Sequence, residues 1–208
     1  MTTGSDIVQR IKDENIKYLD VRFTDLRGKL QHVTMDASVV DADMFEEGVM
    51  FDGSSIAGWK AINESDMVLM PDPDSAYMDP FFAAPTLAVN CDILEPATYQ
   101  PYNRDPRGIA KKAEALVKSS GVGDSVVFGP EPEFFIFDDV KYSTSTYNVG
   151  FSVDSSELPV NSNAEYEGGN NGHHIGLKKG YFPVPPLDSA QDMRGEMLEA
   201  MGSMGVII

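Results

Sequence analysis

The stretch that most constrains this chain is residues 128–137, with the sequence FGPEPEFFIF. Pro130 and Pro132 each fix φ, lack a backbone N–H and push the preceding residue out of the helical region. The stretch therefore cannot be helical, and we expect an extended strand. Side chains of alternate residues share one face of a strand, so Glu131 and Glu133 should point the same way. The sequence thus predicts two carboxylates side by side within an apolar run.

This carboxylate pair has two interpretations. Two like charges about 7 Å apart beside phenylalanine rings are costly without a cation, because burial and mutual repulsion both disfavour ionisation. Mg²⁺ or Mn²⁺ would suit the pair, since hard cations prefer carboxylate oxygens and Mg²⁺ often takes one carboxylate with waters and phosphates. The alternative is a solvent-facing polar edge of a strand. Because Glu-x-Glu is common on strands, spacing alone slightly favours this alternative.

The charge of the chain limits its partners. Among 208 residues, 16 Lys and Arg face 33 Asp and Glu, which gives a formal net charge of −17. Nucleic acid and anionic membranes would be repelled, so we expect neither as a partner. If the substrate is a nucleoside triphosphate, so acidic a chain must bring metal ions to neutralise the phosphates.

Three features of the sequence indicate in which cellular compartment the protein works. The first residues lack a basic stretch followed by an apolar one, and no uninterrupted apolar run approaches the length of a membrane span. The single cysteine, Cys91, cannot form an internal disulfide, which fits a reducing compartment. We therefore expect a cytoplasmic protein, with Cys91 as a small core residue.

The first hundred residues predict a compact α+β unit. A helix should run from about 5 to 14 with Ser5 as N-cap, and a short helix should span 42–47. Strands are expected at 18–25 and 30–35, joined as a hairpin through Gly28, and at 67–70 and 86–92. His32 reads as a surface or cross-strand residue. Residues 95–103 are the expected linker.

Residues 50–59, with the sequence MFDGSSIAGW, form a loop between apolar anchors. Asp52 should bond its own backbone in an Asx-type turn. Phe51, Ile56 and Trp59 bracket this turn and should hold it in place. An anchored acidic loop can be a binding site, so we interpret it first as a turn and second as a site.

The second half predicts further elements around the acidic stretch. A helix should begin at Asp105 and end at Gly121, and residues 143–151 should form a strand. The sequence also predicts a mobile glycine-rich loop at 168–174, a polyproline-like strut at 181–186, and a helix from Asp188. Four methionines of that helix should pack in a core: Met193, Met197, Met201 and Met204. Residues 205–208 read as the start of an apolar strand, which suggests a larger protein truncated here.

Four motifs together resemble the bacterial type I glutamine synthetases: residues 52–55 (DGSS), 63–67 (NESDM), 128–135 (FGPEPEFF) and 180–186 (GYFPVPP). The resemblance covers essentially the whole chain in the same order. It implies an α+β fold, with a β-grasp-like N-terminal domain at 15–103. The first, incomplete part of a catalytic domain would follow at 104–208, built on a curved antiparallel sheet with helices. It also implies a homododecamer of two stacked hexameric rings, with active sites between neighbouring subunits.

The same resemblance implies a reaction and its residues. ATP would phosphorylate the side-chain carboxylate of L-glutamate, and ammonia would displace phosphate to give L-glutamine. Glu131 and Glu133 would each serve one of two Mg²⁺ or Mn²⁺ sites. Asp52 and Ser55, with Tyr181 from the adjoining subunit, would bind ammonium, and Asp52 and Tyr181 would be catalytic. Asp66 matches a family position in the same intersubunit region, but we assign it no part in the reaction.

The chain also departs from the family. Family members are much longer, and their remaining metal, nucleotide and glutamate ligands would follow Ile208, so we expect this fragment to be inactive alone. His174 and Lys179 stand where arginine and glycine are expected in many relatives. Two alternatives stay open: a truncated non-catalytic chain that only assembles with full-length subunits, and a ligase that joins glutamate to an amine. Asp52 argues against the amine ligase, because a small anionic pocket suits ammonium better.

Overall fold

The computed structural model describes residues 1–155 and 178–207, and its fold is mixed α+β. The chain divides into two compact units: Met1–Phe128 with Ala200–Ile208, and Gly129–Glu199.

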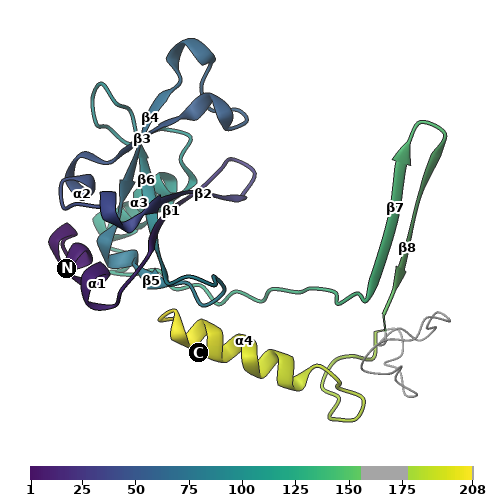
Figure 1. The fold of residues 1–208 in the computed structure, drawn as a ribbon. Helices are drawn as coiled ribbons and strands as arrows, with labels where there is room; N and C mark the ends of the chain where they lie inside the picture. The colour runs from purple at the N-terminus through teal and green to yellow at the C-terminus, as the bar shows by residue number, and fades with distance from the viewer. Residues whose placement is uncertain (156–177, 208) are drawn as a thin grey trace. The chain divides into compact units, whose positions relative to one another are not determined.

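The first unit is built on a six-stranded sheet (Figure 1). Its strands are β1 (Tyr18–Thr24), β2 (Leu30–Asp36), β3 (Val49–Asp52), β4 (Asp66–Pro71), β5 (Tyr77–Met78) and β6 (Thr86–Leu94). They follow the order β2-β1-β6-β4-β3, and β5 also pairs with β6. The central strands β1 and β6 are parallel, whereas the other pairs are antiparallel.

Hydrophobic alternation explains how the sheet forms its core. Leu19, Val21 and Phe23 occupy alternate positions of β1 and are buried in one cluster. The helix α1 (Gly4–Asp13) adds Ile7 and Ile11 from a single helical stripe. The core therefore lies between the sheet and its helices.

The N-terminal helix begins two residues earlier than expected. Thr3, not the predicted Ser5, is the N-cap: its hydroxyl accepts a hydrogen bond from Asp6 N at 3.2 Å. The Asp6 carboxylate in turn accepts from Thr3 N at 2.7 Å. This capping box satisfies two backbone donors at once, which Ser5 could not do from inside the helix.

Most predicted elements of the first unit are confirmed. The β1–β2 hairpin turns at Gly28, with φ +79°, and α2 (Met44–Glu47) ends at Gly48, also at φ +79°. The sequence missed β3 and β5, because both are short. Residues 95–103, the expected linker, pack against the sheet unit: Tyr102 is buried and its hydroxyl donates to Trp59 O at 3.0 Å.

The predicted helix at 105–121 is α3 (Pro106–Ser120), which contacts β1 and β6. Asp105 is its N-cap, and its carboxylate accepts from Ile93 N at 3.2 Å and from Arg107 N and Gly108 N at 3.0 Å. Burial raises the pKa of this carboxyl, although the three amides oppose the shift. Gly121 ends the helix with φ +70°. This helix therefore belongs to the first unit.

In the second unit, the acidic stretch and the predicted strand both differ from expectation. Residues 128–137 are not helical, as predicted, but no strand is assigned to them in the part of the chain the structure describes. The predicted strand at 143–151 is instead parts of two strands, β7 (Asp139–Ser145) and β8 (Asn148–Asp154), joined by residues 146–147. The turn was missed because neither Gly nor Pro marks it.

Three C-terminal expectations are wrong. The 181–186 segment is not polyproline-like, since Phe182 has φ +68° and Leu187 N closes a turn on Val184 O at 3.1 Å. The predicted final helix is present as α4 (Gln191–Ser203), but none of its residues is buried, so the methionines form no core. Residues 205–207 are not a strand. The 168–174 loop, with His173 and His174, lies outside the described residues.

No helix within the described ranges is both long and apolar enough to cross a membrane.

Candidate functional site

Two acidic residues end up opposite each other in the first unit. Asp52 is the last residue of β3, Asp66 is the first of β4, and the antiparallel register pairs them directly. Both residues are exposed. Directly opposed residues have Cβ atoms about 5 Å apart, and like charges at that separation destabilise the pair. The arrangement is therefore favoured when a cation lies beside the two carboxylates.

The hydrogen bonds of Asp52 confirm the expected Asx-type turn. Its Oδ1 accepts from Ser54 N at 2.8 Å and from Ser54 Oγ at 2.6 Å, and its Oδ2 lies 3.5 Å from Ser55 Oγ. The bond from the Ser54 hydroxyl, followed by the one from its amide, lowers the pKa of Asp52 below the usual aspartate range. Asp52 is therefore held in its ionised form.

Close packing against the buried core holds the Asp52 loop in place. Gly53 N donates to Ser65 O at 2.7 Å, and a Cβ at Gly53 would lie 2.4 Å from the Sδ atom of Met67, which is fully buried. Phe51 packs its ring edge-on against Trp59, with centroids 6.1 Å apart. The apolar anchors expected around this loop are thus present, and they give the acidic turn one position.

The second unit brings together two predicted residues that the sequence had assigned to different sites. Glu133 and Tyr181 line one open cavity of about 1000 Å³, together with Arg194 and Asp188, which form an ion pair. Glu131 is exposed and does not line this cavity. Tyr181 is 84% exposed. One metal-site candidate and one ammonium-site candidate therefore share a cavity.

The described residues fit a metal that needs few protein ligands. Within the ranges 1–155 and 178–207, no group of three or more His, Cys, Asp or Glu side chains could hold a metal ion. Glu131 and Glu133 are exposed, and neither forms an ion pair with another residue of the described ranges. One carboxylate per ion, with waters and phosphate oxygens completing the shell, matches the coordination habit of Mg²⁺.

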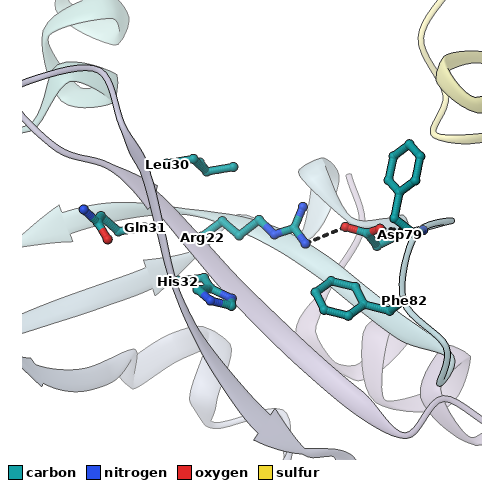
Figure 2. Close-up of a pocket in the computed structure, with 7 residues that line it drawn as sticks. Arg22, Leu30, Gln31, His32, Asp79 and Phe82 are labelled. Carbon is teal, nitrogen blue, oxygen red and sulfur yellow. Dashed lines mark hydrogen bonds and ion pairs between the residues drawn. The ribbon is translucent and has the colours of Figure 1, made fainter. Parts of the chain in front are cut away.

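A separate pocket of about 360 Å³ lies on the first unit and contains none of the predicted site residues. Figure 2 shows Arg22 crossing it toward Asp79. The Arg22 guanidinium donates through Nε to Asp20, through one terminal nitrogen to Tyr77 and through the other to Asp79, each at 2.6 Å. These bonds tie strands together, and we interpret the pocket as structural.

His32 and Cys91 each have a structural role, as the sequence predicted. His32 is a cross-strand residue, as predicted, with Nδ1 2.7 Å from Asp20 Oδ1. Burial raises the pKa of the Cys91 thiol to about 12, so it stays protonated in the core and is no nucleophile.

The sequence did not predict the pairing of Asp66 with Asp52 or the hydrogen bond from the Ser54 hydroxyl to Asp52. The pairing of the two aspartates could have been found only by recognising β3, because the register follows from the β3–β4 ladder. The Ser54 bond had a signal in the Asp-Gly-Ser-Ser sequence itself, since a serine two residues after an aspartate can donate both its amide and its hydroxyl to the carboxylate.

Family models match both parts of the chain. Residues 15–96 match the family described as glutamine synthetase, beta-Grasp domain, and residues 103–208 match glutamine synthetase, catalytic domain. Glutamine synthetase of Bradyrhizobium diazoefficiens is 68% identical over 206 residues, which is 99% of this chain and 44% of that protein. The Escherichia coli K12 enzyme is 55% identical, with the same two coverages.

A cryo-EM structure of Plasmodium falciparum glutamine synthetase has the same fold, with a TM-score of 0.83 at 24% identity. The match covers 99% of this chain and 41% of that one. The fold and the matched regions define a β-grasp domain followed by part of a catalytic domain. This chain belongs to the glutamine synthetase family. The expected α+β fold class is thereby confirmed, and the chain spans 44% of the length of the curated relatives it matches.

Proposed function

We propose that this chain carries part of the active site of an ATP-dependent ligase that joins ammonia to L-glutamate. In the proposed reaction, the γ-carboxylate of glutamate attacks the terminal phosphorus of ATP and ADP leaves. Ammonia then attacks the carbonyl carbon of γ-glutamyl phosphate, the C–N bond forms, and the C–O bond to phosphate breaks. Membership of the glutamine synthetase family supports this reaction class.

The observation that carries the proposal is the ionised Asp52 directly opposite Asp66. An ammonium ion beside the two carboxylates would relieve the repulsion, which supports an ammonium site over a plain turn. Asp52 Oδ2 and Ser55 Oγ would accept its N–H donors, and Asp52 would take the proton released as ammonia reacts. Tyr181, an exposed phenol, would complete the site from an adjoining subunit.

Glu131 and Glu133 are the proposed ligands of two Mg²⁺ or Mn²⁺ ions. When bound, such ions neutralise the phosphate oxygens of ATP and so make phosphoryl transfer to an anionic carboxylate feasible. The role of the chain itself is to hold the two carboxylates apart on an extended backbone, because Pro130 and Pro132 exclude the helical alternative.

The proposal extends to organisation and compartment. The domain boundary is proposed at 103–104, the assembly as a homododecamer, and the location as the cytoplasm. The chain covers 44% of its relatives, so we propose that it has no activity alone and requires the remaining catalytic-domain ligands. A non-catalytic chain that assembles with longer subunits would share this inactivity.

The test uses a chimaera of residues 1–208 followed by the remainder of the Bradyrhizobium relative. Asp52→Ala should depress ammonia-dependent turnover far more than γ-phosphoryl transfer from ATP. Asp36→Ala is the matched control, since Asp36 also N-caps an exposed 3-10 turn but lies opposite Tyr18 rather than a carboxylate. Equal loss of both activities in Asp52→Ala would remove the ammonium assignment, and better turnover with methylamine than with ammonia would favour the amine ligase.

A further inference from the structure

We propose that the hydroxyl of Ser54 is a positioning group that fixes the Asp52 carboxylate, so that Oδ2 is the only oxygen presented to a small cation. This inference rests on the proposed ammonium site and adds a residue that the sequence left without a role. Ser55 remains the ligand of the cation, and Ser54 acts through Asp52.

The hydrogen bonds of the carboxylate are strongly unequal. Both donors of Ser54 bond Oδ1, at 2.6 Å and 2.8 Å, whereas the side-chain contact that the described residues give Oδ2 is the longer one of 3.5 Å with Ser55 Oγ. The Ser55 amide also favours the ionised carboxylate, but less than either donor of Ser54. The side-chain torsion that turns a carboxylate is broad, so the oxygens of an unrestrained aspartate point in a wide range of directions. Rotation of Asp52 would break two short bonds together. Oδ1 is thus committed to Ser54, and Oδ2 keeps its lone pairs for a ligand.

The hydroxyl is not needed to form the turn. Asp72 heads the same kind of 3-10 turn, and its Oδ1 accepts from Asp74 N at 3.2 Å, where the residue two places on has no hydroxyl. A backbone amide therefore suffices for the cap, and the Ser54 hydroxyl adds a shorter bond to the same oxygen. Its contribution is to orient the carboxylate and to keep it ionised.

Exposure separates the roles of the two serines. Ser54 is half-buried and its hydroxyl points to Asp52, whereas Ser55 is exposed at the same turn. The contact between Ser55 Oγ and Oδ2 is at the limit of a hydrogen bond, so an ammonium ion could replace it with two better ones. Without the Ser54 hydroxyl, one bond fewer would restrain the Asp52 side-chain torsion, so the direction in which the second oxygen faces Ser55 would vary more.

The first measurement is an NMR titration of the Asp52 carboxyl in the 208-residue chain. Ser54→Ala should raise the pKa of Asp52, because the largest bond that favours ionisation is lost, and Ser54→Thr should restore it. Ser55→Ala should change this pKa less. An unchanged pKa in Ser54→Ala would overturn the positioning role, whether or not the proposed ligase activity is found.

The second measurement is steady-state kinetics of the chimaera. Ser54→Ala should raise the KM for ammonium by about three- to tenfold, the range expected for one hydrogen bond, with the KM for ATP unchanged and recovery in Ser54→Thr. Ser38→Ala, at the equivalent place after Asp36, should leave the ammonium KM unchanged. An equal rise in both KM values for Ser54→Ala, or no rise in either, would contradict the inference. Failure of the unsubstituted chimaera to use ammonium would instead reject the proposed function.

Discussion

Gly53→Ala should destabilise the first unit and displace the acidic turn at the same time. Gly53 does not have a positive φ, so alanine meets no backbone strain there. The new Cβ would instead lie 2.4 Å from Met67 Sδ, 2.7 Å from Met67 Cγ and 3.1 Å from Ser65 O. Met67, the second residue of β4, is fully buried, so its side chain cannot move into solvent to make room. The overlap must be relieved by moving the loop or the strand.

Overpacking of this kind costs about 1–3 kcal/mol. For a unit of this size that corresponds to a fall in Tm of about 4–12 °C. Urea unfolding can be followed by the fluorescence of Trp59, the single tryptophan, which is buried in the same unit.

Gly123→Ala is the matched control for Gly53→Ala. It lies in the same unit, has no positive φ, and a Cβ there would meet its nearest atom at an ordinary 3.6 Å. Its stability should stay within about 0.5 kcal/mol of the unsubstituted chain. If Gly53→Ala were as stable as this control, the loop would not be held by the packing described, and the fixed geometry of Asp52 would lose its basis.

Two buried aspartates give further predictions. Asp20→Asn should cost about 3 kcal/mol, because it breaks a buried ion pair with Arg22 and weakens the bonds from His32 and Thr34. Burial opposes ionisation of Asp20, yet those bonds lower the pKa of its carboxyl below the usual value. The stabilisation from the ionised carboxylate is therefore fully present above about pH 3.9 and is lost as the pH falls through the folded-state pKa. Acid unfolding curves of Asp20→Asn should lack this loss of stability. Asp105→Ala should lower the free energy of unfolding in urea by about 2 kcal/mol, since it removes an N-cap that accepts from three amides. Asp105→Asn should lower it less. Equal losses of stability in the two variants would show that the cap hydrogen bonds do not cause the loss.

Local chemistry in the sequence predicted most of the first unit. The hairpin at Gly28, the helix between Asp105 and Gly121, and the buried thiol of Cys91 each follow from residues close in sequence. The acidic turn at Asp52 was predicted for the same reason. These elements are stabilised by groups within a few residues or by a continuous apolar face.

Features that depend on distant partners could not be predicted. The opposition of Asp52 and Asp66 requires the β3–β4 register, which no single segment encodes. Residues 128–137 read as a strand, but a strand needs a partner, and none of the described residues pairs with them. The same lack of packing leaves Phe135 86% exposed and α4 without a buried residue. Apolar patterning there predicted burial, which the described residues alone do not supply.

The central claim is that Glu131 and Glu133 hold catalytic cations against phosphate. The most direct measurement is a titration of the chimaera with Mn²⁺ in the presence of ATP, in which the electron paramagnetic resonance signal reports the concentration of free Mn²⁺. The account predicts that Glu131→Gln with Glu133→Gln weakens this binding by about tenfold or more, while Glu114→Gln, an exposed glutamate paired with Lys118 on α3, leaves it unchanged. Undiminished Mn²⁺ and ATP binding in the double variant would contradict this claim and leave the two carboxylates as solvent-exposed polar residues.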